Sequence, residues 1–303
     1  MVYRERERRR AIEYRDRLFH DPGNGIYKDL PREFVLTEPT LNIWPDIRTD
    51  VIDYFTRNNI TWWPGSHTGP SGHLLSSQIA CINHLFSLKH RKDIVSAVLK
   101  SISDDVVEAE MIDEGYVEFE FIGERQYLRE INFNRGENCT SIDAVMIGKL
   151  SDGSRRLFLI EWKYTEYYDV MNKYVPERAK VYDSLITASD SPFLSGVLPK
   201  AFYYEPFYQL MRQTLLAHEC VKHSDHGINS YTHIHIVPEE NGDLKKKITS
   251  PYLHGTNIHD AWRNTLKDDS LFVVRSPEEL MKPAVGMFGD QSYIEYLRER
   301  YWE

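Results

Sequence analysis

The feature that most constrains the fold of this chain is a pair of apolar runs in its middle, IDAVMI over residues 142–147 and LFLIEW over residues 157–162. Between them lies Asp152-Gly153, a dipeptide typical of tight hairpin turns. Both faces of the two runs are apolar, which is typical of central strands covered on both sides. One face carries Val145, Ile147, Leu157 and Leu159, and the other carries Met146, Phe158 and Ile160. The segment therefore predicts a buried β-hairpin.

The length of the hairpin loop decides which side chains lie opposite each other. A two-residue Asp-Gly loop would leave Asp143 and Glu161 on opposite faces of the hairpin. A three-residue Ser-Asp-Gly loop would pair Leu150 with Ser154 and place Gly153 in the left-handed position of a bulge. In that register Asp143 lies opposite Glu161. We predict the three-residue loop.

Two acids and a lysine occupy one end of this apolar hairpin. Because alternate residues of a strand share a side, Asp143, Glu161 and Lys163 are predicted on one face. Buried charges are costly unless they are paired or bind a metal, and two neighbouring carboxylates repel each other. A divalent cation removes this repulsion, and carboxylate oxygens with open water positions suit Mg²⁺ or Mn²⁺. The structural alternative is an ion pair between Lys163 and one carboxylate.

Hydrophobic periodicity and turn residues predict the other elements. Helices are predicted over residues 4–19, 46–58, 73–88, 91–101, 176–188, 204–219, 259–266 and 291–302. Strands are predicted over residues 106–112, 116–122, 141–148, 155–163, 230–238 and 271–274. In the second of these strands, Val117, Phe119 and Phe121 alternate with Glu118 and Glu120.

The chain has 303 residues, 41% of them hydrophobic, which is enough for one large domain or two modest ones. The sequence contains no internal repeat and no convincing interdomain linker. We therefore predict one α/β domain over residues 71–303, with residues 1–70 as a helical and loop extension packed on it.

The acids and the lysine resemble the motif of the PD-(D/E)XK phosphodiesterase superfamily, an acidic residue on one strand and (D/E)-x-K on the next. Asp143 matches the first position, the triplet Glu-Trp-Lys that ends at Lys163 matches the second, and Ile142 replaces the usual proline. The segments HLLSSQIACINHLF, EWKYTE and YQLMRQ also resemble a group of bacterial restriction-endonuclease-like proteins. This resemblance implies a restriction-endonuclease-like core over residues 73–238, with a central mixed β-sheet flanked by helices.

The same resemblance assigns roles to the residues of the motif. Asp143 and Glu161 would bind Mg²⁺ or Mn²⁺, and the backbone carbonyl of Trp162 would complete the metal shell. Lys163 would orient the attacking water and stabilise the charge that develops on the phosphate.

Four further side chains are candidate accessory residues. Gln78 lies on the first core helix, where many family members carry a glutamate, and would serve as a neutral ligand or a water anchor. Glu166 is either a further acid near the site or a solvated loop charge. Gln209 and Arg212 share the polar side of their helix and would contact either substrate phosphate or solvent.

Three other signals carry weaker hypotheses. Residues 218–235 hold several zinc-type side chains, but their spacing fits no familiar zinc module, so we predict a histidine-rich surface. These side chains are Cys220, His223, His226, His233 and His235. Trp62 and Trp63 are predicted in the core, with a base-stacking platform as the alternative. The basic clusters, which could contact a nucleic-acid backbone or solvent, cover residues 4–17, 89–92 and 245–247.

Charge and cysteine content bear on partners and compartment. The net charge of -9 argues against general coating of nucleic acid, although local basic patches and a bound metal are compatible with a nuclease. Three widely spaced cysteines and a charged N-terminal segment predict a cytoplasmic protein without a secretion signal. No apolar run is long enough to span a bilayer, so we expect no membrane association.

The sequence thus predicts a Mg²⁺-dependent nuclease that hydrolyses phosphodiester bonds, with DNA as substrate and restriction or defence as its role. A homodimer would suit the cutting of both strands. One alternative is a nuclease-like fold that binds nucleic acid or a protein partner without cutting, and another is a purely structural cluster of charges. Walker loops, nucleophile elbows and HExxH motifs are absent from the sequence, which removes several other enzyme classes.

Overall fold

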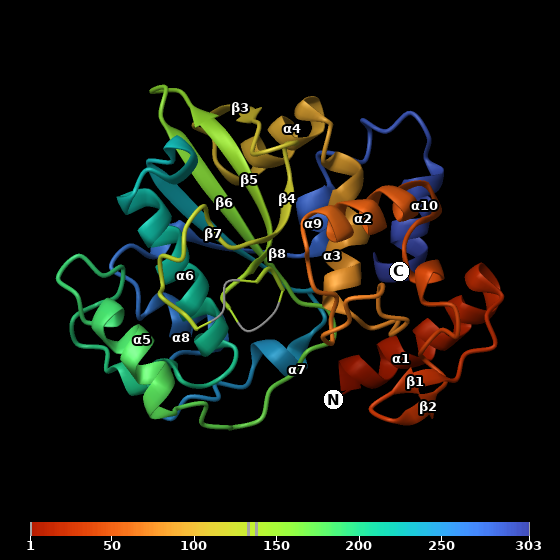
Figure 1. Ribbon diagram of the computed structural model, residues 1–303, viewed down its shortest axis with the longest axis horizontal. Helices are drawn as coiled ribbons and strands as arrows, with labels where there is room; N and C mark the ends of the chain where they lie inside the picture. Colours follow the sequence, from red (N-terminus) through yellow and green to blue (C-terminus); the bar gives the residue numbers. More distant parts are fainter. Residues whose placement is uncertain (1, 132–133, 137–138, 303) are drawn as a thin grey trace.

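The computed structural model describes residues 2–131, 134–136 and 139–302, and its centre is a six-stranded sheet (Figure 1). The strands are β3 (Val106–Glu110), β4 (Glu118–Phe121), β5 (Ile142–Leu150), β6 (Arg155–Trp162), β7 (Ser230–Ile236) and β8 (Phe272–Arg275). Strand β5 is antiparallel to β6 on one side, and to β3 and β4, which follow each other along its other edge. Strands β6, β7 and β8 are parallel. The sheet is therefore mixed, as predicted.

The β5–β6 hairpin has the predicted three-residue loop. Gly153 has a φ of +86°, the left-handed conformation that a bulged loop requires. Its N–H donates to the carbonyl of Leu150 at 2.9 Å, and the N–H of Leu150 donates to the carbonyl of Ser154 at 2.8 Å. These two bonds close the loop in the register that the sequence predicted.

The register of this hairpin continues to its open end. Ala144 of β5 pairs with Ile160 of β6, so the residues next to them on the two strands, Asp143 and Glu161, lie opposite each other. The apolar side chains of the hairpin that are fully buried come from both faces: Val145, Met146, Ile147, Leu157, Phe158, Leu159 and Ile160. The prediction of central strands covered on both sides is confirmed.

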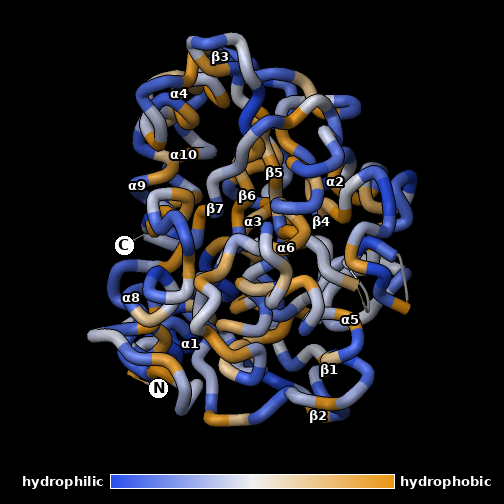
Figure 2. The backbone as a smooth tube through the Cα atoms, turned by 90° about the vertical axis from the view of Figure 1, so that its left-hand side faces the viewer, coloured by the Kyte–Doolittle hydropathy of each residue, from blue (hydrophilic) through white to orange (hydrophobic). Residues whose placement is uncertain are grey.

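Helices cover both faces of the sheet (Figure 1). The helices of one face are α2 (Pro45–Arg57), α3 (Ser77–Leu85), α4 (Lys92–Ile102), α9 (Pro277–Met281) and α10 (Ser292–Leu297). The helices of the other face are α5 (Pro176–Ile186), α6 (Phe207–Lys222) and α8 (Ile258–Arg263). The inner strands are correspondingly hydrophobic and the outer turns hydrophilic (Figure 2). Two apolar cores, one on each side of the sheet, hold the three layers together.

Shorter elements complete the fold. At the lower end in Figure 1 lie α1 (Val2–Tyr14), α7 (Gly242–Lys245) and a small antiparallel sheet of β1 (Gly25–Tyr27) and β2 (Leu30–Arg32). Single helical turns are η1 (Arg15–Phe19), η2 (Pro39–Asn42), η3 (Phe86–Leu88), η4 (Pro199–Phe202), η5 (Asp225–Gly227), η6 (Asp269–Leu271) and η7 (Arg298–Trp302).

The predicted elements are present with boundaries shifted by local signals. The helix predicted from residue 73 begins at Ser77, because the side chain of Ser76 caps it by accepting the N–H of Ile79 at 3.4 Å. Helix α6 begins at Phe207, directly after Pro206, and not at residue 204. The β1–β2 hairpin, α7 and α9 lie in segments for which the sequence predicted no regular element.

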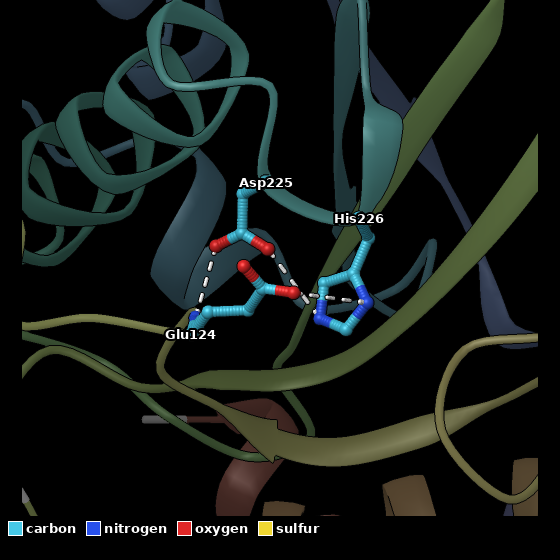
Figure 3. A group of neighbouring side chains, drawn as sticks. All are labelled: Glu124, Asp225 and His226. Carbon is cyan, nitrogen blue, oxygen red and sulfur yellow. Dashed lines mark hydrogen bonds and ion pairs between the residues drawn. The ribbon is translucent and has the colours of Figure 1, made fainter.

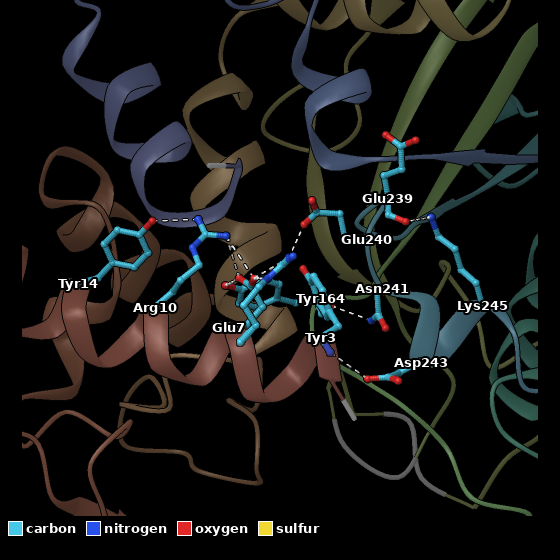
Figure 4. A network of polar contacts seen from close by, with 11 residues as sticks. Tyr3, Glu7, Arg10, Tyr14, Tyr164, Glu239, Glu240, Asn241, Asp243 and Lys245 are labelled. Atoms are coloured by element: carbon cyan, nitrogen blue, oxygen red, sulfur yellow. Dashed lines mark hydrogen bonds and ion pairs between the residues drawn. The ribbon is translucent and has the colours of Figure 1, made fainter.

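The N-terminal helix is tied to the sheet by a buried charge (Figure 4). Glu7 of α1 is fully buried and accepts a hydrogen bond from the hydroxyl of Tyr164 at 2.9 Å. Arg6 and Arg10 of the same helix form ion pairs with Glu7 at 3.1 and 3.2 Å. Because Tyr164 directly follows Lys163, helix α1 supports the chain that carries the candidate lysine.

Replacing Glu7 by alanine is expected to lower the free energy of unfolding by about 3 kcal/mol, because it leaves Arg10 and the hydroxyl of Tyr164 without their partner. Urea unfolding followed by circular dichroism measures this loss. The matched control is Glu5→Ala: Glu5 is half exposed and pairs with Arg8 at 3.0 Å, so its loss is expected to cost less than about 0.5 kcal/mol. Equal losses of unfolding free energy in the two variants would show that the buried contacts of Glu7 stabilise the fold no more than an exposed ion pair does.

The state of the cysteines and the apolar character of the helices bear on disulfides and membrane spans. Cys81, Cys139 and Cys220 are free thiols, and each is buried. Among the helices in the described part of the chain, none combines the length and the apolar character needed to cross a membrane.

Candidate active site

A cavity of about 400 Å³ opens where β4 and β6 end and β5 begins, between helices α3 and α6. Residues from distant parts of the sequence meet in its wall. All of the residues that the sequence singled out for the site line it: Gln78, Asp143, Glu161, Trp162, Lys163, Glu166, Gln209 and Arg212. The fold therefore brings the predicted residues together around one space.

A further acid, Glu120, lies in the same cavity and was not predicted. Phe119 pairs with Ala144 and Phe121 pairs with Ile142, which puts Glu120 of β4 opposite Asp143 of β5. Glu120, Asp143 and Glu161 thus form a row across three neighbouring strands, and we call these three residues the acid row.

Glu120 was not recognised from the sequence because β4 has an alternating pattern of apolar and acidic residues. The alternation of β4 is typical of a strand with one polar, solvated face, yet Glu118 and Glu120 are 5% and 6% exposed. Glu120 also has a φ of +50°, which is unusual for a residue with a side chain and marks a local irregularity in the strand. The feature of the sequence that could have revealed Glu120 is the pair of acids, Glu118 and Glu120, in the strand that precedes the hairpin.

Hydrogen bonds fix the two predicted acids. Asp143 accepts the backbone N–H of Trp162 through Oδ2 at 2.7 Å. Glu161 is fully buried and accepts a hydrogen bond from the amide of Gln213 through Oε2. The same amide donates to the carbonyl of Ser141 at 3.2 Å. Gln213 is thus a further site residue that the sequence did not reveal, since it reads there as one polar position on a helix.

Lys163 lies beside the acid row and is buried. Its ammonium forms an ion pair with Oε1 of Glu161 and donates to the side-chain oxygen of Gln209 at 2.6 Å. It also lies 6.0 Å from the centre of the Tyr168 ring. The ion pair that the sequence left open as a structural alternative is therefore present.

Burial and neighbouring charges together set the pKa values of Asp143, Glu120 and Lys163, and each net shift is upward. Burial, followed by the charges of Glu161 and Glu120, raises the pKa of Asp143 well above its ordinary value. Burial is also the largest influence that raises the pKa of Glu120, and the charge of Glu161 adds to it. Burial lowers the pKa of Lys163, but the negative charges around the ammonium, that of Glu161 first among them, together outweigh burial and the net shift is upward. Lys163 is thus an ammonium, and the acid row favours additional positive charge.

The donor set fits a hard divalent cation. Carboxylate oxygens are the ligands that Mg²⁺ and Mn²⁺ prefer, and a cation removes the repulsion within the acid row. Oε1 of Glu161 is buried, and its partner is the ammonium of Lys163. The oxygens of the acid row are not drawn into a tight cluster, so the structure shows the ion-paired arrangement of the site.

Gln78 connects the acid row to the loop in front of α3. Its amide nitrogen donates to Oε1 of Glu120 at 2.7 Å, and its oxygen accepts the backbone N–H of Trp63 at 2.9 Å. A glutamine suits this position because it donates on one side and accepts on the other. In the structure Gln78 holds an acid in place.

The remaining accessory candidates face the cavity. Glu166 accepts the backbone N–H of Tyr164 at 2.6 Å, which shapes the turn after β6. Arg212 lies with its guanidinium 4.8 Å from the centre of the Tyr208 ring and 3.9 Å from Glu130. Gln209 holds the ammonium of Lys163. The polar side of α6 therefore lines the site and is not an ordinary solvated face.

A second group of metal-type ligands joins the end of β4 to the turn after α6 (Figure 3). The ligand atoms of Glu124, Asp225 and His226 lie within 4.8 Å of one another. Nε2 of His226 is 3.4 Å from Asp225, and Nδ1 is 3.9 Å from Glu124. Because each ring nitrogen faces a different carboxylate, the geometry is that of an imidazole between two acids, which requires no metal.

The prediction that residues 218–235 form a histidine-rich surface is wrong for two histidines. His233 and His235 are 2% and 0% exposed on β7, a strand with neighbours on both sides. Nδ1 of His233 lies 3.0 Å from the hydroxyl of Thr214, and Nδ1 of His235 lies 3.1 Å from Nε2 of His259. Burial lowers the pKa of His233 to about 3, so this ring is neutral.

The prediction that both neighbouring tryptophans lie in the core is correct for one of them. Trp62 is 3% exposed and stacks on Phe55 with ring centroids 3.9 Å apart. Trp63 is 40% exposed and lines the cavity. The chain turns directly after Trp62, whose carbonyl accepts the N–H of Ser66 at 2.8 Å, so one ring is buried and the other is not.

Replacing Glu120 by glutamine is expected to raise the melting temperature in EDTA by a few degrees, because it removes a buried charge that repels Glu161. The same change is expected to weaken Mn²⁺ binding about tenfold, as the loss of one supporting carboxylate does. Thermal melts with and without Mn²⁺ measure both effects. Glu118→Gln is the control on the same strand: it removes the ion-pair partner of Arg135, so it should lower stability and leave Mn²⁺ binding unchanged. Identical behaviour of the two variants would remove Glu120 from the site.

Comparison with known proteins gives one match. The sequence profile of a family described as Restriction Endonuclease associating with ARP matches residues 7–302. No curated protein and no solved structure gives a significant match to the chain. The matched span includes the acid row, Lys163 and both layers of helices, and so extends far beyond the motif region.

Proposed function

The chain belongs to the family of restriction endonucleases associating with ARP, and on this premise we propose that it is a metal-dependent nuclease that hydrolyses phosphodiester bonds in DNA. The α/β core with its central mixed sheet is restriction-endonuclease-like. The observation that carries the proposal is the meeting of the acid row and Lys163 in one cavity at the end of that sheet.

The acid row supplies the ligands of the cation in this proposal. Asp143 and Glu161 would hold Mg²⁺ or Mn²⁺ together with the backbone carbonyl of Trp162, and Glu120, which lies opposite Asp143, would be a further ligand. A bound cation supplies positive charge to the scissile phosphate and lowers the pKa of a coordinated water. The raised pKa of Asp143 supports this assignment, because besides burial it is the negative charges of Glu161 and Glu120 that raise it, and a cation would offset these charges.

Lys163 acts on the phosphate in this proposal. Its ammonium, held by Gln209, donates to a non-bridging oxygen and stabilises the negative charge that grows as water attacks. It also orients the attacking water. Arg212 and Gln209 hold the neighbouring phosphate groups of the strand, while Glu166 shapes the turn that carries Lys163.

The proposal extends to partners and compartment. The family description names an association with ARP, and we extend that association to this chain. We place the protein in the cytoplasm, where its three buried free thiols stay reduced. A homodimer would present two copies of the cavity to the two strands of a duplex.

A second candidate function rests on the ion pair between Lys163 and Glu161. That pair, with the bond from Gln213, satisfies Glu161 without a cation. A nuclease-like module that binds nucleic acid or a protein without cutting it would keep this arrangement permanently. The two candidates differ in whether a divalent cation displaces the ion pair.

Incubation with plasmid, linear duplex, single-stranded DNA and RNA, each with Mg²⁺, Mn²⁺ or EDTA, tests the proposal. We expect cleavage of DNA that requires a divalent cation and is lost in Lys163→Ala. Equal cleavage by the wild type and Lys163→Ala would point to a contaminating nuclease and end the catalytic assignment. Binding without cleavage under every condition would favour the silent module.

A further inference from the structure

The mouth of the cavity carries a group of aromatic side chains that the catalytic assignment does not use. We call Tyr27, Phe34, Trp63 and His73 the aromatic rim. The rings of Tyr27 and Trp63 lie 5.8 Å apart, and both residues line the cavity together with His73. Trp63 is 40% exposed, so part of a large ring faces solvent beside the acid row. An exposed indole at such a place offers a flat surface for stacking.

His73 is the centre of the aromatic rim. Its ring meets Tyr27, Phe34 and Trp63 edge-on, with centroids 4.7, 5.1 and 5.5 Å away. Burial, followed by the charge of Arg4, lowers the pKa of His73 to about 4, so the ring is neutral. Nδ1 accepts the N–H of Leu75 at 3.2 Å, which leaves the proton on Nε2. Nε2 has no hydrogen-bond partner among the described residues, an unused donor in the wall of the cavity.

Cations surround the aromatic rim. The guanidinium of Arg8 lies 4.8 Å from the centre of the Phe34 ring, and the ammonium of Lys28 lies 5.5 Å from the centre of the Tyr27 ring. Arg4 lines the cavity and lies 5.5 Å from the ring of Tyr167. In the described part of the chain, neither Arg4 nor Lys28 has a carboxylate within ion-pair distance. Positive charge with exposed aromatic rings is the combination that binds single-stranded nucleic acid.

One side chain joins the aromatic rim to the acid row. Gln78 accepts the backbone N–H of Trp63 and donates to Glu120. A single residue therefore links the backbone of Trp63 to Glu120 of the acid row, beside which the scissile phosphate would lie. A nucleotide next to that phosphate reaches the indole with its base only when the base is unpaired and turned out of a helix.

We propose that the aromatic rim binds an unpaired nucleobase beside the scissile phosphate, so that the substrate is a single strand or a locally opened duplex. Trp63 stacks on the base, and Arg4 and Lys28 hold the flanking phosphates. This inference rests on the proposed nuclease function, which places the phosphate at the acid row.

Binding in the absence of metal tests the base site apart from catalysis. Lys163→Met protein in EDTA, at one fixed ionic strength, is titrated with a fluorescent single-stranded DNA oligonucleotide, and with an oligonucleotide of the same length made of abasic sugar phosphates. We expect the natural oligonucleotide to bind roughly 10- to 100-fold more tightly, the range expected for stacking of one base on an aromatic ring. Adding Trp63→Ala should remove that difference and leave abasic binding unchanged, whereas Trp63→Phe should retain most of it.

The control variant is Tyr252→Ala, since Tyr252 is 44% exposed, carries Lys200 at 4.4 Å from its ring, and lies away from this cavity. It should bind both oligonucleotides as the parent does. Equal loss of natural and abasic binding in Trp63→Ala, tight binding of natural DNA by that variant, or preference of the parent for fully paired duplex would each overturn the base site. An RNA arm shows whether the site discriminates the sugar. Failure of the nuclease proposal appears separately, as absent cleavage by the wild type with metal.

Discussion

Lys163→Met is expected to lower the single-turnover rate of phosphodiester cleavage by about 10³-fold, which corresponds to about 4 kcal/mol of transition-state stabilisation. The lysine ammonium lies in a buried site, where one positive charge aimed at a developing negative charge has its largest effect. Methionine keeps much of the length of the side chain and removes the charge. Quenched-flow cleavage of a labelled oligonucleotide under saturating Mg²⁺ measures the rate.

The control for this loss is Lys222→Met, which removes a half-exposed lysine of α6 that pairs with Asp190 at 2.8 Å. Its cleavage rate should match that of the wild type. Lys163→Met also frees Glu161 from its ion pair, so metal binding should be retained or strengthened. A variant that loses both cleavage and metal binding would show that Lys163 serves the fold, and a variant that cleaves at the wild-type rate would exclude it from the chemistry.

Asp143→Asn is expected to abolish cleavage to at least the same degree and to weaken Mn²⁺ binding at least about 100-fold. Asparagine retains an oxygen that accepts the N–H of Trp162, so the fold is preserved. The change removes the carboxyl group of Asp143, whose pKa is raised by burial and by the charges of Glu161 and Glu120. The melting temperature in EDTA should therefore rise, while the stabilisation that Mn²⁺ gives the wild type should vanish. Isothermal titration calorimetry and thermal melts measure these effects.

A matched control separates the acid row from the other group of acidic ligands. Asp225→Asn changes an aspartate that is 1% exposed and lies beside Glu124 and His226 (Figure 3). It is expected to lower stability, because asparagine has one side-chain oxygen where Asp225 uses two, one for the backbone N–H of Glu124 and one facing His226, and to leave Mn²⁺ affinity intact. Loss of Mn²⁺ binding in Asp225→Asn with full binding in Asp143→Asn would move the metal site to that second group.

The hairpin could be predicted from the sequence because its determinants are local. The Asp-Gly turn, the two apolar runs and the strand period of two together leave few registers open. The choice of a three-residue loop then placed Asp143 opposite Glu161 without knowledge of any distant residue. Helix ends moved by a few residues where caps such as Ser76 set the start.

Glu120 could not be predicted in the same way because no short turn links β4 to β5. Some twenty residues separate the two strands, so no loop length fixes their register. Gln213 was hidden for a related reason, since its partner Glu161 lies far away in the sequence and the two meet only when α6 packs on the sheet. Pairwise contacts between remote segments decide such positions, and a single sequence does not record them.

Burial was misjudged where composition was used in place of topology. His233 and His235 read as polar surface, but β7 is an interior strand and its side chains are covered on both faces. Trp63 reads as core, but the turn that buries Trp62 leaves its neighbour at the cavity. In both cases the position of the segment in the sheet outweighed the character of the side chain.

The acid row and Lys163 are proposed to form one divalent-metal centre. Crystals grown with Mn²⁺ and measured at the manganese absorption edge locate the ion directly. We predict an anomalous peak coordinated by Asp143 and Glu161, with Lys163 turned away from Glu161. Crystals soaked in Mn²⁺ that show no peak at the acid row and retain the ion pair between Lys163 and Glu161 would contradict the account.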